Sequence, residues 1–258
     1  MDLRERAPSA PNGPAVRHPW EQARARFVLE RLAGISVGPG TRLLDVGAGD
    51  GWLAGEIQRA TGCRVTCWDH AYRDDDEQRL RERGVAASRV APTEQFDVAL
   101  VLDVLEHADD DLALLRSAAL CVRPGGHVLV TVPAWPALFS AHDRALCHRR
   151  RYTPATCRRL LQRAELVVDE AGGLFHGLLA ARALAVLLER VGVGADASIA
   201  GVGHWRAGPM VSGAVTAMLR AEQHLSLRVA RRGLELPGLS WFALCTRPAL
   251  GSWQSAAP

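Results

Sequence analysis

A carboxylate and a run of small residues occur together where they could bind a nucleotide-like molecule. Residues 43–51 have the sequence LLDVGAGDG, in which an apolar stretch ends in Asp45. The loop that follows contains Gly47, Ala48, Gly49 and Gly51. Glycines let the backbone approach a ligand closely, and the start of the next helix favours a bound polar group. The pattern predicts a cofactor site at the carboxyl edge of a sheet.

The charge of Asp45 indicates the kind of cofactor. The glycine spacing is G-x-G-x-G, not the G-x-G-x-x-G of dinucleotide-binding folds. A fixed carboxylate would repel a pyrophosphate but attract the ammonium of a methionine moiety, directly or through water. Asp69 ends the next apolar segment and can accept hydrogen bonds from both ribose hydroxyls, and His70 could pack on adenine. Each aspartate alone could simply cap a strand end, but together they favour S-adenosylmethionine over NAD.

Methyl transfer from a sulfonium is an in-line displacement, so the protein must align the acceptor and, for a hydroxyl acceptor, remove a proton. Histidine titrates close to neutral pH and suits that role. Candidate bases follow two predicted strands, at His107, His142 and His148. We favour His142, because Asp143 gives it an acidic neighbour and the segment after the fifth strand gives access.

The same region permits two other interpretations. Asp103, Glu106 and His107 could simply begin the next helix. They could also join His142 or His148 around a divalent cation, since oxygen and imidazole ligands would then meet in one cleft. The favoured prediction contains no metal.

Aromatic and charged side chains near the expected crevice could contact the acceptor. The aromatic candidates are Trp20, Trp135, Phe139 and Trp205, although such residues are more often part of the core. Residues 149–151 are three arginines, of which one or two would bind an anionic substrate group or pair with Glu222. The alternative is a structural tie between lid and core. We expect Arg150, Tyr152 and Glu222 to belong to the substrate site.

Strands and helices that alternate along the chain are expected to position these residues. The predicted strands are residues 42–46, 63–68, 85–90, 96–102, 127–132, 166–169 and 240–246. The predicted helices are residues 20–32, a helix ending near 61, and residues 74–83, 109–121, 153–164, 174–190 and 211–232. On the last helix an apolar stripe is expected, formed by Val211, Val215, Met218, Leu225 and Val229, with Glu222 on the same face. This order predicts an α/β fold: a Rossmann-like doubly wound sheet, mostly parallel with an antiparallel edge strand, plus a helical lid.

The predicted chain has four parts. They are a disordered tail at 1–19, a cofactor-binding core at 20–171, a helical lid or dimerisation insertion at 172–237, and the last core strand with a tail at 238–258. The insertion is too long for a simple connection.

Composition excludes several classes of protein. The 258 residues carry 31 basic side chains, all arginine, against 28 acidic ones, a net charge of +3 that is too small to indicate a nucleic-acid partner. Six scattered cysteines have neither zinc nor disulfide spacing, which favours a cytoplasmic protein with reduced thiols. Charged residues interrupt the longest apolar stretch, 174–193, so no membrane span is expected.

Several segments, taken in order, resemble the motifs of class I S-adenosylmethionine-dependent methyltransferases. They are LLDVGAGDG, Asp69, FDVALVLDVLEH at 96–107 and RPGGHVLVTVP at 123–133. The resemblance covers about residues 41–170 and is highly specific in combination. It implies that Asp45, Gly47, Gly49 and Asp69 contact the cofactor and that Asp103 and Val104 lie beside it.

A narrower resemblance is to bacterial small-molecule methyltransferases. It rests on VPAWPALFSAHDRALCHRRRYT at 132–153, on the aromatic and arginine-rich helix before the sheet, and on LPGLSWFAL at 236–244. Around Asp103 the chain is similar to some ubiquinone-pathway and small-RNA methyltransferases, although these have glutamate at that position. Where the family places an acidic residue near adenine, this chain has Ala91 and Pro92, and the nearest carboxylate is Glu94.

We therefore expect a cytoplasmic S-adenosylmethionine-dependent methyltransferase that acts on a small or lipid-like acceptor, with oxygen as the target atom and a histidine as base. A homodimer through the insertion is a further option. The alternatives are a metal-dependent RNA 2'-O-methyltransferase and a non-catalytic cofactor-binding scaffold.

Overall fold

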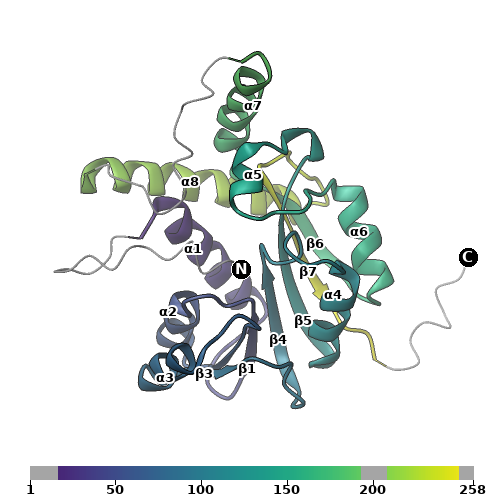
Figure 1. Cartoon of the computed structure of the whole chain (residues 1–258). Coiled ribbons are helices and arrows are strands. Elements are labelled where there is room, and N and C mark those ends of the chain that lie inside the picture. Colours follow the sequence, from purple (N-terminus) through teal and green to yellow (C-terminus); the bar gives the residue numbers. More distant parts are fainter. Residues whose placement is uncertain (1–16, 193–207, 250–258) are drawn as a thin grey trace, which may run out of the picture.

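A seven-stranded sheet forms the centre of the computed structural model, which describes residues 17–192 and 208–249 (Figure 1). The strands are β1 (Arg42–Val46), β2 (Arg64–Trp68), β3 (Ala86–Ser88), β4 (Phe96–Leu102), β5 (Val122–Pro133), β6 (Val167–Leu174) and β7 (Ser240–Thr246). Their spatial order is β3-β2-β1-β4-β5-β7-β6, with parallel pairing from β3 to β5. Only β7 pairs antiparallel, with β5 on one side and the edge strand β6 on the other. The predicted fold class is confirmed.

Helices cover both faces of the sheet. They are α1 (Pro19–Gly34), α2 (Trp52–Thr61), α3 (Asp74–Glu82), α4 (Asp111–Leu120), α5 (Ala141–Ala145), α6 (Pro154–Arg163), α7 (His176–Arg190) and α8 (Pro209–Ala230). Successive strand residues point to opposite faces, so Leu43 packs into one core with α1, α2, α3 and α8, and Leu44 packs into the other with α4 and α6. The carboxyl ends of β1, β2, β4 and β5 thus meet at one edge of the sheet.

Local sequence explains where several helices begin. Thr153 accepts a hydrogen bond from the backbone N–H of Thr156 at 3.1 Å, and Pro154 occupies the first helical position, as the sequence predicted for α6. Asp110 caps α4 in the same way through the N–H of Ala113 at 2.9 Å. His18 caps α1, where Pro19 is again the first helical residue.

The N-terminal boundary differs from the predicted one. Arg17 forms ion pairs with Glu21 and Asp50, and α1 begins at Pro19, so residues 17–19, which the prediction assigned to the tail, contact the core. Residues 1–16 lie outside the described residues. Among the helices of the described ranges, none combines the length and the hydropathy that a membrane span needs.

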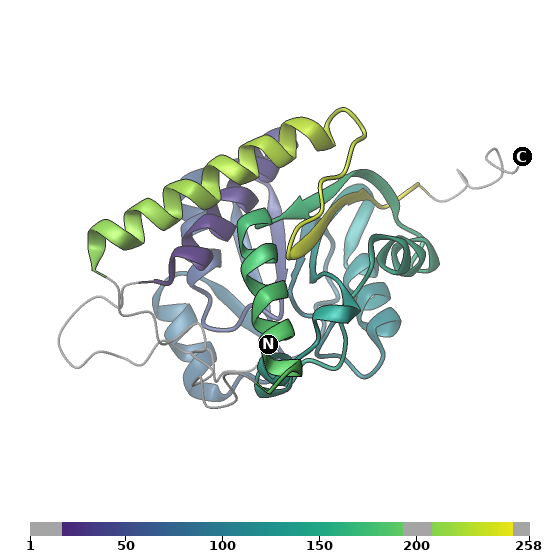
Figure 2. The same cartoon turned by 90° about the horizontal axis from the view of Figure 1, so that it is seen from above.

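The two helices of the insertion occupy different places. Helix α8 runs alongside α1 over one face of the sheet, whereas α7 packs against the short 3₁₀ helix η2 (Pro136–Leu138) that follows β5 (Figure 2). The apolar stripe predicted on α8 is not the face that α8 buries, because Val211, Met218 and Leu225 are exposed. The buried face instead consists of Ser212, Leu219, Gln223, Ser226, Leu227 and Ala230. Within the insertion, α7 is therefore the helix that covers the loop after β5.

Candidate active site

The glycine loop after β1 packs closely against two neighbouring segments. Gly47 has a φ of +65°, and a Cβ atom there would lie 2.7 Å from the side chain of Val104. Gly51 has a φ of +68°, and its Cβ would overlap the side chain of Leu80 in α3. Because L-residues avoid positive φ and neither neighbour leaves room, both positions require glycine.

Asp69 joins this loop to the end of β2. Its Oδ2 accepts the backbone N–H of Gly49 at 3.1 Å, and its Oδ1 accepts that of Ala71 at 2.9 Å. The backbone N–H of Gly47 bonds to the carbonyl of Trp68 at 2.7 Å. The side chain of Asp69 is buried, so these bonds hold the loop at the carboxyl edge of the sheet.

Asp45 is a buried carboxylate at the head of the same loop, with 3% of its surface exposed. Burial raises the pKa of Asp45 to about 7, and the charges of Asp69 and Asp50 add to this effect. The guanidinium of Arg24 opposes it. A cationic ligand beside Asp45 would favour its ionised form.

A cavity of about 440 Å³ opens between this loop and the segment after β4. Its lining includes Gly47, Trp68, Asp69, His70, Val104, His107 and Arg149. His70 is 88% exposed at its rim, where it could cover an adenine. Glu94 cannot contact that ligand, because it pairs with Arg42 at the start of β1, on the opposite edge of the sheet.

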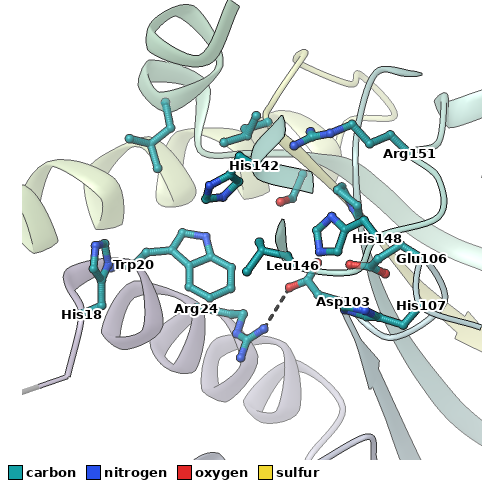
Figure 3. Close-up of a pocket in the computed structure, with 14 residues that line it drawn as sticks. His18, Trp20, Arg24, Asp103, Glu106, His107, His142, Leu146, His148 and Arg151 are labelled. Carbon is teal, nitrogen blue, oxygen red and sulfur yellow. Dashed lines mark hydrogen bonds and ion pairs between the residues drawn. The ribbon is translucent and has the colours of Figure 1, made fainter. Parts of the chain in front are cut away.

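A second cavity, of about 260 Å³, lies beside the first, and His107 lines both. Figure 3 shows Trp20 and Arg24 of α1 on one side of it and Glu106, His107 and His148 on the other. The apolar part of the lining consists of Trp20, Pro133, Leu146, Leu178 and Leu239. The ionisable part consists of His18, Arg24, Asp103, Glu106, His107, His142, His148 and Arg151. This combination suits an acceptor with an apolar body and a polar reacting group.

Arg24 pairs with Asp103 on the wall of the second cavity. Its Nη1 lies 2.9 Å from Asp103 Oδ2, and its guanidinium lies 4.4 Å from the centre of the Trp20 ring. Asp103 has a φ of +54°, so the chain turns sharply after β4 and brings this carboxylate to the cavity wall. Of the two residues expected beside the cofactor, Val104 lines the first cavity and Asp103 lines the second.

Asp143 is paired with His148 and not with His142. Its Oδ1 lies 3.0 Å from His148 Nδ1, and the fully buried carboxylate also accepts hydrogen bonds from Arg151 and Arg182. Burial alone would raise the pKa of Asp143, but the bond with His148 and the charges of the two arginines hold it well below its usual range. Asp143 thus hydrogen-bonds to His148, and it affects His142 through its charge, which works against the lowering of that imidazole's pKa by burial.

His142 nevertheless lines the second cavity. Burial lowers the pKa of His142, and the charge of Arg182 lowers it further. The imidazole of His142 is accordingly neutral at physiological pH.

The structure also brings together three of the side chains weighed as metal ligands. One ligand atom each of Glu106, His107 and His148 lies within 4.8 Å of the others, and the rings of His107 and His148 meet edge to face at 4.8 Å. Asp103 and His142 are outside this group.

Several predicted substrate contacts have structural roles instead. Arg150 donates to the carbonyls of Ala108 and Asp109, at 3.0 Å each, and pairs with Asp111. Tyr152 is buried and donates its hydroxyl to Asp111 at 2.8 Å. These bonds tie the chain after α5 to the start of α4, so neither side chain lines the second cavity.

The remaining predicted contacts also lie elsewhere. Glu222 accepts the backbone N–H of Gly177 at 3.0 Å and so caps the start of α7, and it does not pair with the arginines. Trp135 donates its indole N–H to the carbonyl of Gly238 at 2.8 Å. Neither Trp135 nor Phe139 lines the second cavity, and Trp205 lies outside the described residues.

Sequence reasoning missed several residues at the site. Arg24, four residues after Trp20, shares its helix face, and this spacing could have identified it. Ser140 and Asp143 form a capping box at α5, a pattern that was visible in the sequence. Arg182 is 39 residues from Asp143, and no local pattern indicates the contact.

Comparison with known proteins identifies the family. The family model described as "Methyltransferase domain" matches residues 16–171. Over 122 residues the chain is 34% identical to the ubiquinone biosynthesis O-methyltransferase of Vibrio cholerae serotype O1, a match that covers 43% of this chain and 48% of that protein. The enzyme of the same name from Aeromonas salmonicida is 26% identical over 190 residues, with 63% and 76% covered. The chain spans about half the length of the Vibrio relative.

The fold is shared with a solved structure that holds a product of the cofactor. Geranyl diphosphate C-methyltransferase from Streptomyces coelicolor A3(2), in complex with Mg²⁺, geranyl diphosphate and S-adenosyl-L-homocysteine, is similar with a TM-score of 0.55 at 16% identity, covering 88% of this chain and 79% of that one. Because the family model covers more than half of the sequence, this chain belongs to the methyltransferase domain family.

Proposed function

We propose that this methyltransferase transfers the methyl group to an oxygen atom of a small acceptor with an apolar body, held in the cavity beside Trp20. One observation carries the proposal: a histidine paired with a buried carboxylate, His148 with Asp143, lines an apolar cavity that adjoins the cofactor cavity. A hydroxyl acceptor needs a proton acceptor, whereas an amine that reacts as the free base does not.

The hydrogen bond to Asp143 determines which nitrogen of His148 would accept the proton. A carboxylate only accepts, and the low pKa of Asp143 keeps it ionised, so Nδ1 carries the hydrogen and donates it over 3.0 Å. Nε2 is then the basic nitrogen. Asp143 would stabilise the imidazolium formed as the hydroxyl loses its proton.

The apolar wall supports an aromatic or lipid-like acceptor. Trp20 offers a flat surface opposite His148, with Leu146, Leu178 and Leu239 completing the wall. The similarity to relatives named O-methyltransferases supports oxygen as the target.

A metal-assisted version of the same reaction is the second candidate, favoured by the grouping of Glu106, His107 and His148. A carboxylate and two imidazoles are a donor set that suits a divalent transition metal. Such an ion would lower the pKa of a bound hydroxyl and so supply the chemistry otherwise assigned to His148.

The test is a turnover assay with S-adenosylmethionine labelled in the methyl group. The probes are catechol, 3,4-dihydroxybenzoate and an alkylated catechol, and the products are identified by mass. We expect the label in an aryl methyl ether, with the alkylated probe giving the highest kcat/KM. Label on carbon or nitrogen, or cofactor binding without turnover of any probe, would contradict the proposal.

Two variants and a chelator then separate the mechanisms. We expect His148→Gln to lower kcat by about 100-fold or more, the size of a general-base contribution, with unchanged cofactor affinity. His142→Gln should keep most of the activity. Loss of activity with EDTA and recovery with Mn²⁺ or Zn²⁺ would contradict the histidine-base mechanism and support the metal-assisted one.

A further inference from the structure

The carboxylate of Asp143 is shared among side chains from different parts of the chain. Its Oδ1 receives hydrogen bonds from His148 Nδ1 at 3.0 Å and from Arg151 Nε at 2.8 Å. Its Oδ2 receives bonds from Arg182 Nη2 at 2.9 Å and from the backbone N–H of Ser140 at 3.0 Å. Each oxygen therefore has one arginine, and His148 uses only Oδ1.

Arg182 reaches this carboxylate from α7. It also donates to Ser140 Oγ at 2.7 Å, so a single guanidinium binds both ends of the capping box of α5. Three further contacts hold α7 on this segment: Glu189 accepts the N–H of Ala141 at 3.0 Å and pairs with Arg144 at 3.5 Å, and Arg190 donates to the carbonyl of Ala137 at 2.6 Å. Helix α7 is thus fixed to the loop that carries His148.

Competition for the carboxylate explains why Arg182 matters. An arginine prefers to bind both oxygens of a carboxylate with its planar fork. Arg151 donates its Nε to Oδ1 and its Nη1 to the carbonyl of Ala134 at 3.0 Å, and Arg182 is the arginine on Oδ2. Without Arg182, we expect the remaining Nη2 of Arg151 to turn to Oδ2, which would draw the carboxylate towards Arg151 and weaken the bond between Oδ1 and His148 Nδ1.

We propose that Arg182 is a positioning residue for His148 and acts through Asp143. By holding Oδ2, it keeps Oδ1 on the imidazole and fixes the tautomer and orientation that direct Nε2 to the cavity. Arg182 is not among the residues that line the cavity, so it has no direct contact with the acceptor there. The inference rests on the proposed function, in which His148 takes the proton. It implies that α7, which carries Arg182, must pack against this segment for the imidazole of His148 to be correctly oriented.

The first test needs no acceptor. In protein labelled with ¹⁵N-histidine, the ring nitrogens of His148, assigned with His148→Gln, report the Nδ1–H tautomer and its hydrogen bond. In Arg182→Gln we expect these signals to move towards a mixture of tautomers, and in Arg182→Lys, which returns a cation to Oδ2, to stay near those of the unaltered protein. Arg190→Gln is the matched control, because Arg190 also ties α7 to this segment but does not touch Asp143. Unchanged His148 signals in a folded Arg182→Gln variant would overturn the proposal.

Kinetics give the second test, with whichever catechol probe is turned over. Arg182→Gln should lower kcat by about tenfold or more at unchanged KM and cofactor affinity, a part of the general-base contribution. Adding Arg182→Gln to His148→Gln should cause no further loss, since the two residues act in one unit. Equal losses in both backgrounds would overturn the proposal. If His148→Gln is fully active while the His148 signals still respond to Arg182→Gln, the base assignment fails and the positioning contact stands.

Discussion

The backbone N–H of Gly49 lies 3.1 Å from Asp69 Oδ2, and this bond connects the glycine loop after β1 to the end of β2. The other oxygen of the same carboxylate accepts the N–H of Ala71 at 2.9 Å. Asp69 thus shapes the loop by itself, before any ribose is bound.

Asp69→Ala should weaken binding of S-adenosylhomocysteine by about 10- to 100-fold, because it removes both the loop contact and the predicted ribose acceptor. Asp69→Asn keeps one acceptor oxygen, so its affinity for S-adenosylhomocysteine should lie between those of Asp69→Ala and the unaltered protein. Titration calorimetry measures this, with Asp75→Ala, an exposed aspartate of α3, as control. Equal affinities of Asp69→Ala and the control would rule out the role.

Cofactor affinity should depend on pH through Asp45. Burial raises the pKa of Asp45 to about 7, so protonation below that value removes the negative charge that attracts the methionine ammonium. We expect affinity to fall by up to about tenfold per pH unit below neutrality. Calorimetry between about pH 5.5 and 8.5 should show a flat and weak profile for Asp45→Asn. A steep profile in that variant would assign the dependence to another group.

Asp45 also makes the stability of the cofactor-free protein depend on pH, but in the opposite direction: stability should fall as pH rises. A carboxyl whose folded pKa is raised stabilises the fold most fully below its unfolded pKa, and that contribution is lost as pH rises towards 7. Thermal unfolding should therefore show Asp45→Asn gaining stability relative to the unaltered protein as pH increases from acid to neutral. A constant difference in Tm over this range would contradict the expectation.

Gly47→Ala should damage cofactor binding beyond its effect on stability. Both Gly47 and Gly84 have positive φ, so alanine at either costs about 1 kcal/mol or more of folding free energy. Only at Gly47 would the new Cβ meet another side chain, that of Val104 on the wall of the cofactor cavity, whereas Gly84 has open space. We expect both variants to lose Tm, with the larger loss in Gly47→Ala because its new Cβ would lie 2.7 Å from Val104, and weaker cofactor binding in Gly47→Ala alone. Equal Kd values would disprove the role of this contact.

Trp20 and Tyr152 should separate acceptor binding from stability. Trp20→Leu removes the flat wall of the acceptor cavity and should raise KM for the catechol probes by about tenfold, at unchanged cofactor affinity. Tyr152→Phe loses a buried hydrogen bond to Asp111 and should cost about 1 to 2 kcal/mol of stability while leaving KM unchanged. An increased KM in Tyr152→Phe would indicate that Tyr152 contacts the acceptor.

Much of the sheet was predictable because apolar runs with clear boundaries need little tertiary information. The bounds of β1, β4 and β7 match the predicted ones, each being a short apolar segment next to turn or loop residues. β6 is longer than predicted and continues to Leu174, because pairing with β7 extends a segment that contains Gly172 and Gly173. Glycine does not favour strands, so the strand conformation of these two residues follows only from their pairing with β7.

The partner of Asp143 was not predictable from adjacency. Neighbouring residues on a helix point about 100° apart, so Asp143 in α5 cannot easily face His142. His148 lies beyond the end of α5, where the chain turns back and brings its ring to the carboxylate. The segment that makes this turn contains Cys147 at a φ of +59°, and a cysteine in the sequence does not predict this backbone conformation.

The orientation of α8 depended on its neighbour. The apolar stripe is a sound periodic signal, but α8 packs against both α1 and β6 and buries another face. On that face Ser226 donates its hydroxyl to the carbonyl of Gly173, and Ala230 lies beside Gly172. Periodicity alone cannot rank two such faces of one helix.

The insertion leaves the sheet after Leu174 and returns at Ser240, two residues that face each other in the ladder between β6 and β7. The two ends of the intervening polypeptide are held together regardless of what lies between them, and closing a longer loop adds little entropic penalty. Changes of length or sequence between these two residues should therefore leave the register of β5, β7 and β6 unchanged.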